Sequence, residues 1–183
     1  LPKDLQERIQ DAIDAVDNHP KGNLELGYRQ AIWSALGPFV YDVNAKNNEG
    51  YKRRALLAIM SAKYVLPLWK QVFEGDKAPE RLLVQSEQTV RGTLAIHKWI
   101  EAMRDYWSHL EGIAGEVKDS VLYAGMSVYQ ALEATRVDES FDEQGTIDYS
   151  AEDSNEPATW DAALLAAEAY ASAPELSEDK VSK

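Results

Sequence analysis

Cysteine is absent from all 183 residues, which excludes disulfide bonds and thiolate metal ligands. A chain without cysteine is typical of the reducing interior of a cell, so we expect a cytoplasmic protein. Long hydrophobic runs are missing too, since no apolar stretch approaches the roughly 18–20 residues that span a bilayer. The opening LPKDLQERIQDAIDAV is an amphipathic polar segment rather than a signal peptide. We therefore expect no membrane association.

The motifs of common catalytic, phosphate and metal sites are also missing. The chain contains no Gly-x-Gly, no Gly-Lys-Ser/Thr, no Gly-x-Ser-x-Gly and no Glu-x-x-His. The histidines His19, His97 and His109 are scattered, and His97 with Glu101 has the spacing of an ordinary contact on a helix surface. We expect no catalytic residue, no metal site and no cofactor.

Negative charge is concentrated at the end of the chain. Residues 1–137 carry 18 acids against 17 bases, a net of −1, whereas residues 138–183 carry 13 acids against 2 bases, a net of −11. Such asymmetry bears on partners rather than on the fold. Nucleic-acid binding needs basic clusters, and the one cluster is Lys52, Arg53 and Arg54, which either pairs with the acidic segment or faces water. We expect a basic protein partner and no nucleic acid.

Residues 138–156, DESFDEQGTIDYSAEDSNE, have no hydrophobic period and form a predicted acidic loop, in which QGTIDYS is a weak candidate for a strand. Aligned to a calcium-binding EF-hand loop from Asp138, the segment has Glu143 in place of the glycine and Tyr149 in place of the bidentate glutamate. Specific calcium binding is therefore disfavoured, which leaves a solvated loop or a surface for a basic partner. The partner-binding candidates are Asp138, Glu139, Asp142, Glu143, Asp148, Glu152 and Asp153.

Apolar residues recur at helical spacing through most of the chain, which predicts an all-α fold of about seven helices. The expected helices cover residues 3–18, 25–45, the stretch YKRRALLAIMSAKYVLPLWKQVF, 79–91, 93–111, the small-residue-rich 116–136 and the segment PATWDAALLAAEAYASAP. The stretch ending in KQVF is apolar most of the way round, including Met60 and Tyr64, and predicts a central, heavily buried helix. We expect one compact domain over residues 1–173 and a disordered tail over 174–183.

Two prolines interrupt the predicted helices. Pro38, in ALGPFVYD, and Pro67, in YVLPLWKQVF, each lack an amide donor and clash with the preceding turn. We expect a kink or break at Pro38 and a kink at Pro67, where burial of the large apolar side chains that follow offsets the lost hydrogen bond. Gly75 and Pro79, in EGDKAP, predict the end of one helix and the start of the next.

The central residues resemble the all-helical immunity proteins of bacterial polymorphic toxin systems. The similar segments are YRQAIWSALGPFVYDVNAK, RRALLAIMSAKYVLPLWKQVFEGDKAPERLLVQSEQTVRG, AGMSVYQALEAT and AALLAAEAYA. The most specific is VLPLWKQVFEGDKAPERLL, residues 65–83. In that family a Val-Leu-Pro-Leu-Trp run closes a long helix, a Gly-Asp turn follows, and a proline begins the next helix. The resemblance covers residues 28–92 well and the later alanine-rich helices only in style.

The resemblance implies a bacterial, non-enzymatic protein that binds and neutralises a cognate toxin in the producing cell, and it carries over no catalytic residue. The −11 charge on the last 46 residues would suit a basic toxin such as a nuclease. Two other functions stay open. One is a helical scaffold or small-ligand-binding bundle, which could form a homodimer through its small-residue helices. The other is an enzyme whose carboxylate-based site no local motif reveals.

Overall fold

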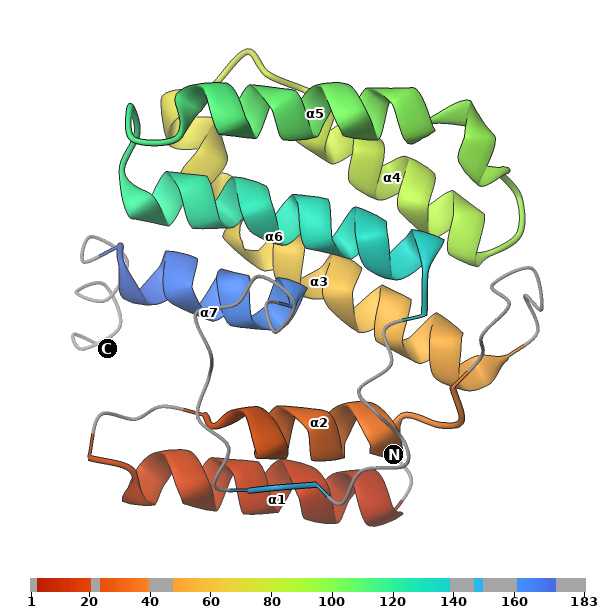
Figure 1. Ribbon diagram of the computed structural model, residues 1–183, viewed down its shortest axis with the longest axis vertical. Helices are drawn as coiled ribbons and strands as arrows, with labels where there is room; N and C mark the ends of the chain where they lie inside the picture. The colour runs from red at the N-terminus through yellow and green to blue at the C-terminus, as the bar shows by residue number, and fades with distance from the viewer. Residues whose placement is uncertain (1–2, 21–23, 40–47, 139–146, 150–160, 174–183) are drawn as a thin grey trace, which may run out of the picture. The chain divides into compact units, whose positions relative to one another are not determined.

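The computed structural model describes residues 3–20, 24–39, 48–138, 147–149 and 161–173, which fold into α-helices with no strand among them (Figure 1). The helices are α1 (Lys3–Asn18), α2 (Leu26–Ala35), α3 (Glu49–Val72), α4 (Ala78–Val90), α5 (Ile100–Ile113), α6 (Asp119–Arg136) and α7 (Ala162–Ala171). A short 3-10 helix, η1 (Ile96–Lys98), lies between α4 and α5. The prediction of an all-α fold with about seven helices is confirmed.

Packing divides the chain into two compact units. The first unit comprises Leu1–Arg54 and Asp138–Thr159, and the second comprises Ala55–Val137 and Trp160–Lys183. Helix α3 therefore begins in the first unit and ends in the second. The single domain over residues 1–173 stays a prediction, and the expected tail over 174–183 lies outside the described residues.

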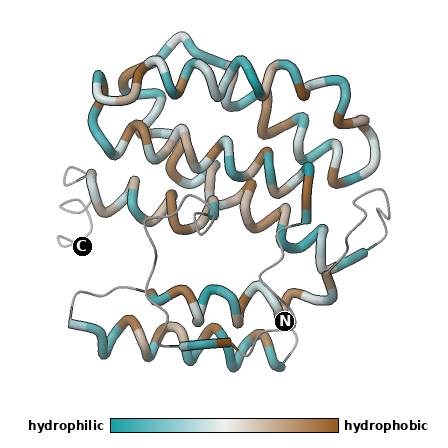
Figure 2. The backbone as a smooth tube through the Cα atoms, in the orientation of Figure 1, coloured by the Kyte–Doolittle hydropathy of each residue, from teal (hydrophilic) through white to brown (hydrophobic). Residues whose placement is uncertain are grey.

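In the first unit, α1 packs against α2 through apolar side chains. Leu5 and Ala12 of α1 are buried, as are Ala31 and Trp33 of α2. Figure 2 shows hydrophobic and hydrophilic residues alternating along α1, as expected of a helix that buries one face. Ile13 of α1 is apolar, yet it is 48% exposed. Helix α1 therefore buries a narrower stripe than its sequence indicates.

The turn after α2 confirms the break expected at Pro38. Gly37 has a φ of 130°, which is strained for residues with a side chain, and Pro38 cannot continue a helix. Helix α2 therefore ends at Ala35 rather than near residue 45, and residues 40–47 lie outside the described part of the chain. A Cβ at Gly50 would lie 2.4 Å from the carbonyl oxygen of Pro38, so the start of α3 passes very close to this turn.

Helix α3 continues through Pro67 to Val72, and both of its ends agree with the expected helix to within two residues. Pro67 is exposed, whereas Leu68 and Trp69 directly after it are 2% and 0% exposed. The proline thus lies on the solvent side, and the large apolar side chains that follow are buried. The prediction of a helix buried nearly all round is wrong, because Met60 and Tyr64 are 66% and 62% exposed.

Asp76 joins the end of α3 to the start of α4 and explains the motif VLPLWKQVFEGDKAP. Its Oδ2 accepts a hydrogen bond from the Trp69 indole Nε1 at 3.1 Å, and its Oδ1 accepts one from the Ala78 amide at 2.8 Å. Pro79 occupies the first turn of α4, where its missing amide costs nothing. Lys70 of α3 forms an ion pair with Glu80 of α4. The motif therefore builds a fixed corner between two helices.

Helix α6 is central to the second unit, where it packs against α4, α5 and α7. Its small residues permit the close approach that the sequence predicts. A Cβ at Gly125 would lie 2.5 Å from Leu110 Cδ2 and 2.6 Å from Trp69 Cζ3. The largest fully buried side chains of the second unit are Trp69, Trp99, Ile59, Leu82, Leu83, Leu110 and Leu132.

Three predicted helix starts need correction, and the smallest change is that the helix expected over residues 116–136 begins at Asp119. The helix expected over residues 93–111 begins only at Ile100, because the chain first forms η1 and Trp99 has a non-helical φ of −134°. Trp99 is buried there, and its Nε1 donates to Thr89 Oγ1 at 2.9 Å. The last helix begins at Ala162 after the N-cap Asp161, whose side chain accepts hydrogen bonds from two backbone amides at 2.8 Å.

Candidate functional site

Asp138, the first of the acidic candidates, is buried rather than exposed, with 2% of its surface accessible. Arg54 donates to its carboxylate through two hydrogen bonds, from Nε to Oδ1 at 2.7 Å and from Nη2 to Oδ2 at 2.6 Å. This bidentate arrangement is the strongest geometry for an arginine–carboxylate pair. A partner cannot reach a carboxylate that is enclosed in this way. Asp138 is therefore a structural residue and not part of an exposed acidic surface.

Arg54 also binds the turn that ends α2. Its Nη1 donates to the carbonyl oxygens of Gly37 at 2.6 Å and Trp33 at 3.3 Å, and its Nη2 donates to that of Pro38 at 3.0 Å. All three guanidinium nitrogens are thus hydrogen-bonded, which offsets the cost of burying the charge. The pair fixes the start of the acidic segment to the turn between α2 and α3.

The basic cluster at the start of α3 is engaged within the first unit. Besides Arg54, Arg53 donates to the carbonyl oxygen of Leu36 at 3.2 Å, and Lys52 Nζ lies 3.1 Å from a carboxylate oxygen of Glu49. Of the alternatives that the sequence left open, Arg54 pairs with the acidic segment. Burial, together with the charge of Asp138, raises the pKa of the neighbouring Tyr51 to about 12. Its phenol therefore stays protonated at neutral pH.

Asp148 is the other acidic candidate that the structure describes, and it is exposed. It lies in the short stretch 147–149, which runs very close to α2 at Gly27. A Cβ at Gly27 would lie 2.3 Å from the carbonyl oxygen of Asp148 and 2.7 Å from Tyr149 Cα, so only glycine admits this stretch. The remaining candidates, Glu139, Asp142, Glu143, Glu152 and Asp153, lie outside the described residues.

A polar groove of about 500 Å³ lies in the first unit and is lined by α1, Tyr28 of α2 and Tyr149. The two tyrosine rings meet edge to face, with centroids 5.0 Å apart and planes at 60°. Arg8 of α1 donates from Nη1 to the Tyr149 hydroxyl at 3.0 Å. The carboxylates of Asp11 and Asp14 line the same groove, which therefore combines aromatic walls with negative charge.

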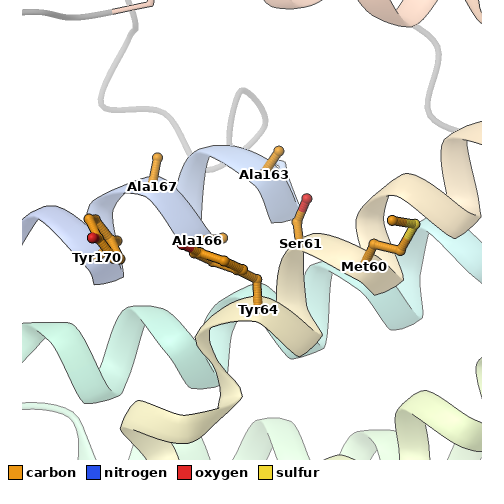
Figure 3. A pocket seen from close by; sticks show the side chains of 7 residues that line it. All are labelled: Met60, Ser61, Tyr64, Ala163, Ala166, Ala167 and Tyr170. Carbon is orange, nitrogen blue, oxygen red and sulfur yellow. The ribbon is translucent and has the colours of Figure 1, made fainter. Parts of the chain in front are cut away.

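An apolar groove of about 480 Å³ lies in the second unit, between α3 and α7. Figure 3 shows the Tyr64 and Tyr170 side chains close together, and their ring centroids are 6.1 Å apart. Met60 of α3 and alanines of α7 complete the lining. This groove could not be predicted from the sequence, because the exposed Met60 and Tyr64 recur with the same spacing as core residues.

Shifted pKa values among the described residues belong to glutamates in ion pairs and to tyrosines that are buried or half-buried. Hydrogen bonds from Lys63 and Arg91 lower the pKa of Glu87, and the hydrogen bond from Lys70 lowers that of Glu80. Burial and the nearby Glu133 raise the pKa of Tyr129 to about 12. Each shifted group thus has a structural cause, and an arrangement of facing acids and bases does not emerge from them.

The described residues contain no group of three or more His, Cys, Asp or Glu side chains placed to hold a metal ion. Within the same part of the chain, no helix has the length and apolar content to cross a bilayer. The described surface has a polar groove, an apolar groove and exposed acids, and these features suit binding.

The chain matches the model of the family described as Immunity protein Imm5 over residues 9–182. The resemblance indicated by VLPLWKQVFEGDKAPERLL is thereby confirmed. No curated protein matches the chain.

Proposed function

We propose, on the premise that this chain belongs to the Imm5 family of immunity proteins, that it neutralises one cognate toxin by binding it directly. The family match, which covers residues 9–182, is the observation that carries the proposal. It indicates a toxin-neutralising immunity function, a protein toxin as the partner and a task that generally needs no catalysis. The protein acts in the cytoplasm of the bacterium that makes the toxin.

The toxin is proposed to be basic, for example a nuclease domain. The net charge of the chain is −12, and residues 138–183 hold 13 acids against 2 bases. Clustered negative charge attracts a positive partner over a distance, which speeds association and disfavours wrong partners. A nuclease must carry positive charge to bind nucleic acid, and an acidic protein competes for that same surface.

The proposed contact surface includes Glu139, Asp142, Glu143, Asp148, Glu152 and Asp153. Asp138 is left out because it is buried against Arg54. Within the first unit, the stretch at Tyr149 contacts α2 at Gly27 and accepts a hydrogen bond from Arg8 of α1. These two attachments, at Asp138 and at Tyr149, support the proposal, because a segment with fixed points loses less entropy when it binds.

The test is complex formation with the toxin domain. The probe is the small basic C-terminal domain of a large secreted protein encoded beside this chain's gene, made with its active site inactivated. We expect a nanomolar complex by calorimetry, and we expect the full chain to protect cells that express the active domain. A well-folded chain that neither binds the domain nor protects the cells would contradict the proposed function.

A further inference from the structure

We propose that the groove lined by α1, Tyr28 and Tyr149 receives an arginine or lysine side chain of the partner protein. The inference rests on the proposed function, which supplies a protein partner with a basic surface. The inference places one basic side chain of the partner in this groove. The groove, of about 500 Å³, is large enough for one long side chain and its neighbouring backbone.

The tyrosines supply the first half of the recognition. Their rings are held in an edge-to-face pair 5.0 Å apart, and Arg8 Nη1 fixes the Tyr149 hydroxyl at 3.0 Å. Aromatic faces attract cations, and arginine stacks on them more often than lysine does. Tyr149 is 37% exposed, so an incoming side chain can reach it.

The carboxylates of Asp11 and Asp14 supply the second half. Both residues are exposed and line the groove from α1. Asp14 is oriented by Gln10, whose Nε2 donates to Oδ1 at 2.8 Å, and Asp11 has no ion-pair partner among the described residues. Helix α1 carries five acids against two bases, so its surroundings favour a cation.

The chemistry of the lining excludes other small ligands. An anion would be repelled by Asp11 and Asp14, and a metal ion would find only these two carboxylates, because the described residues offer no group of three metal-ligating side chains. A large apolar group would leave those carboxylates without water or a partner. A flexible cation with an apolar stem satisfies both the rings and the acids, which describes arginine and lysine.

The tyrosine wall depends on backbone fit at Gly27. Because only glycine leaves room for the carbonyl oxygen of Asp148, 2.3 Å from a Cβ at that position, the substitution Gly27→Ala is expected to displace Tyr149. The binding site for the cation would then lose one wall while α1 keeps both carboxylates. This variant separates the contribution of the rings from that of the charge.

The first experiment uses N-acetyl-arginine amide as the probe and the full chain observed by NMR. We expect saturable chemical-shift changes at Asp11, Asp14, Tyr28 and Tyr149, and none with the isosteric, uncharged N-acetyl-citrulline amide. Asp11→Asn/Asp14→Asn should abolish the changes, and Gly27→Ala should weaken them. Equal changes with both amides, or changes spread evenly over the acidic surface, would overturn the proposal. This arm does not require the toxin, so it can fail while the proposed function stands.

The second experiment measures association and dissociation rates with the inactivated toxin domain. Asp11→Asn/Asp14→Asn is compared with Glu7→Gln/Asp17→Asn, which removes the same charge from α1 outside the groove. We expect both to slow association similarly, and only the groove variant to speed dissociation, by about tenfold for each lost ion pair. Equal dissociation rates would overturn the inference but not the proposed function. If light scattering shows a dimer in which a second copy of the chain occupies the groove, the inference is overturned while the proposed function stands.

Discussion

Arg54 and Asp138 lie 84 positions apart in the sequence and meet in the interior of the first unit. Arg54 also donates hydrogen bonds to the backbone carbonyl oxygens of Trp33, Gly37 and Pro38. Buried ion pairs of this kind contribute little relative to an apolar replacement, but they cost much when only one partner is removed. Their value to this fold is that they fix two distant segments in one geometry.

Arg54→Met is therefore expected to lower the free energy of unfolding by about 3–5 kcal/mol, because Asp138 would stay buried without its partner. The double variant Arg54→Met/Asp138→Leu should recover most of that loss, since no charge remains buried. Lys52→Met, which removes an exposed contact on the same helix turn, should cost less than about 1 kcal/mol. Urea unfolding followed by circular dichroism measures all three. A single Arg54 variant as stable as the native chain would contradict this account.

A second prediction at this scale concerns Glu87, whose pKa is lowered mainly by the hydrogen bond from Lys63 and then by that from Arg91. A lowered pKa means that the stabilising contribution is present above the pKa of the unfolded chain and is lost as the pH falls through the folded pKa. Lys63→Met is expected to raise the pKa of Glu87 towards its ordinary value. Side-chain carbonyl NMR measures the titration. Lys98→Met, which removes an exposed lysine elsewhere, should leave it unchanged.

At the scale of helices, the corner between α3 and α4 follows from a short stretch of sequence. Trp69, Asp76, Ala78 and Pro79 lie within a few residues of one another, and their hydrogen bonds are local. For that reason the sequence predicts the end of α3 and the start of α4 to within a residue. The packing of α6 depends on contacts from other helices, and Gly125 shows how closely they approach.

Two glycine substitutions test this packing. Gly125→Ala is expected to lower the free energy of unfolding by about 1–3 kcal/mol, because the new methyl group would overlap Trp69 and Leu110. Gly112→Ala, in α5, has no atom within 4 Å of the new Cβ. It should therefore raise stability, by up to about 1 kcal/mol, through helix propensity alone. Urea denaturation of both variants gives the comparison, and effects of the same sign would refute the close-packing explanation.

At the scale of the whole molecule, the uneven charge is the feature with the clearest consequence for function. Residues 1–137 are nearly neutral, and the last quarter of the chain holds most of the net charge. Charge of this kind acts over a Debye length of about 10 Å at 0.1 M salt, so it guides a partner before contact is made. The uneven charge says little about which surface of this chain the bound partner finally covers.

Neutralising Glu139, Asp142 and Glu143 to the matching amides is expected to slow association with the toxin domain by about tenfold at low salt. The dependence of the association rate on salt should weaken in the same variant. The control replaces three exposed acids of the second unit, Glu74, Asp105 and Glu116, by their amides. Stopped-flow fluorescence at several salt concentrations measures both. Equal slowing in the two variants would show that net charge, rather than the acidic segment, guides the encounter.

The sequence by itself determined the all-α class, most helix boundaries and the corner at Asp76, because each depends on neighbours within a few turns, and its motif at residues 65–83 indicated the family. The tertiary structure decided what depends on residues far apart. Asp138 looked like one acid among seven, and only its meeting with Arg54 removed it from the surface. Met60 and Tyr64 looked like core because helical spacing does not state which face is covered. The polar groove lined by Tyr28 and Tyr149 exists because Gly27 lets residues 148–149 approach α2, a contact between segments more than a hundred residues apart.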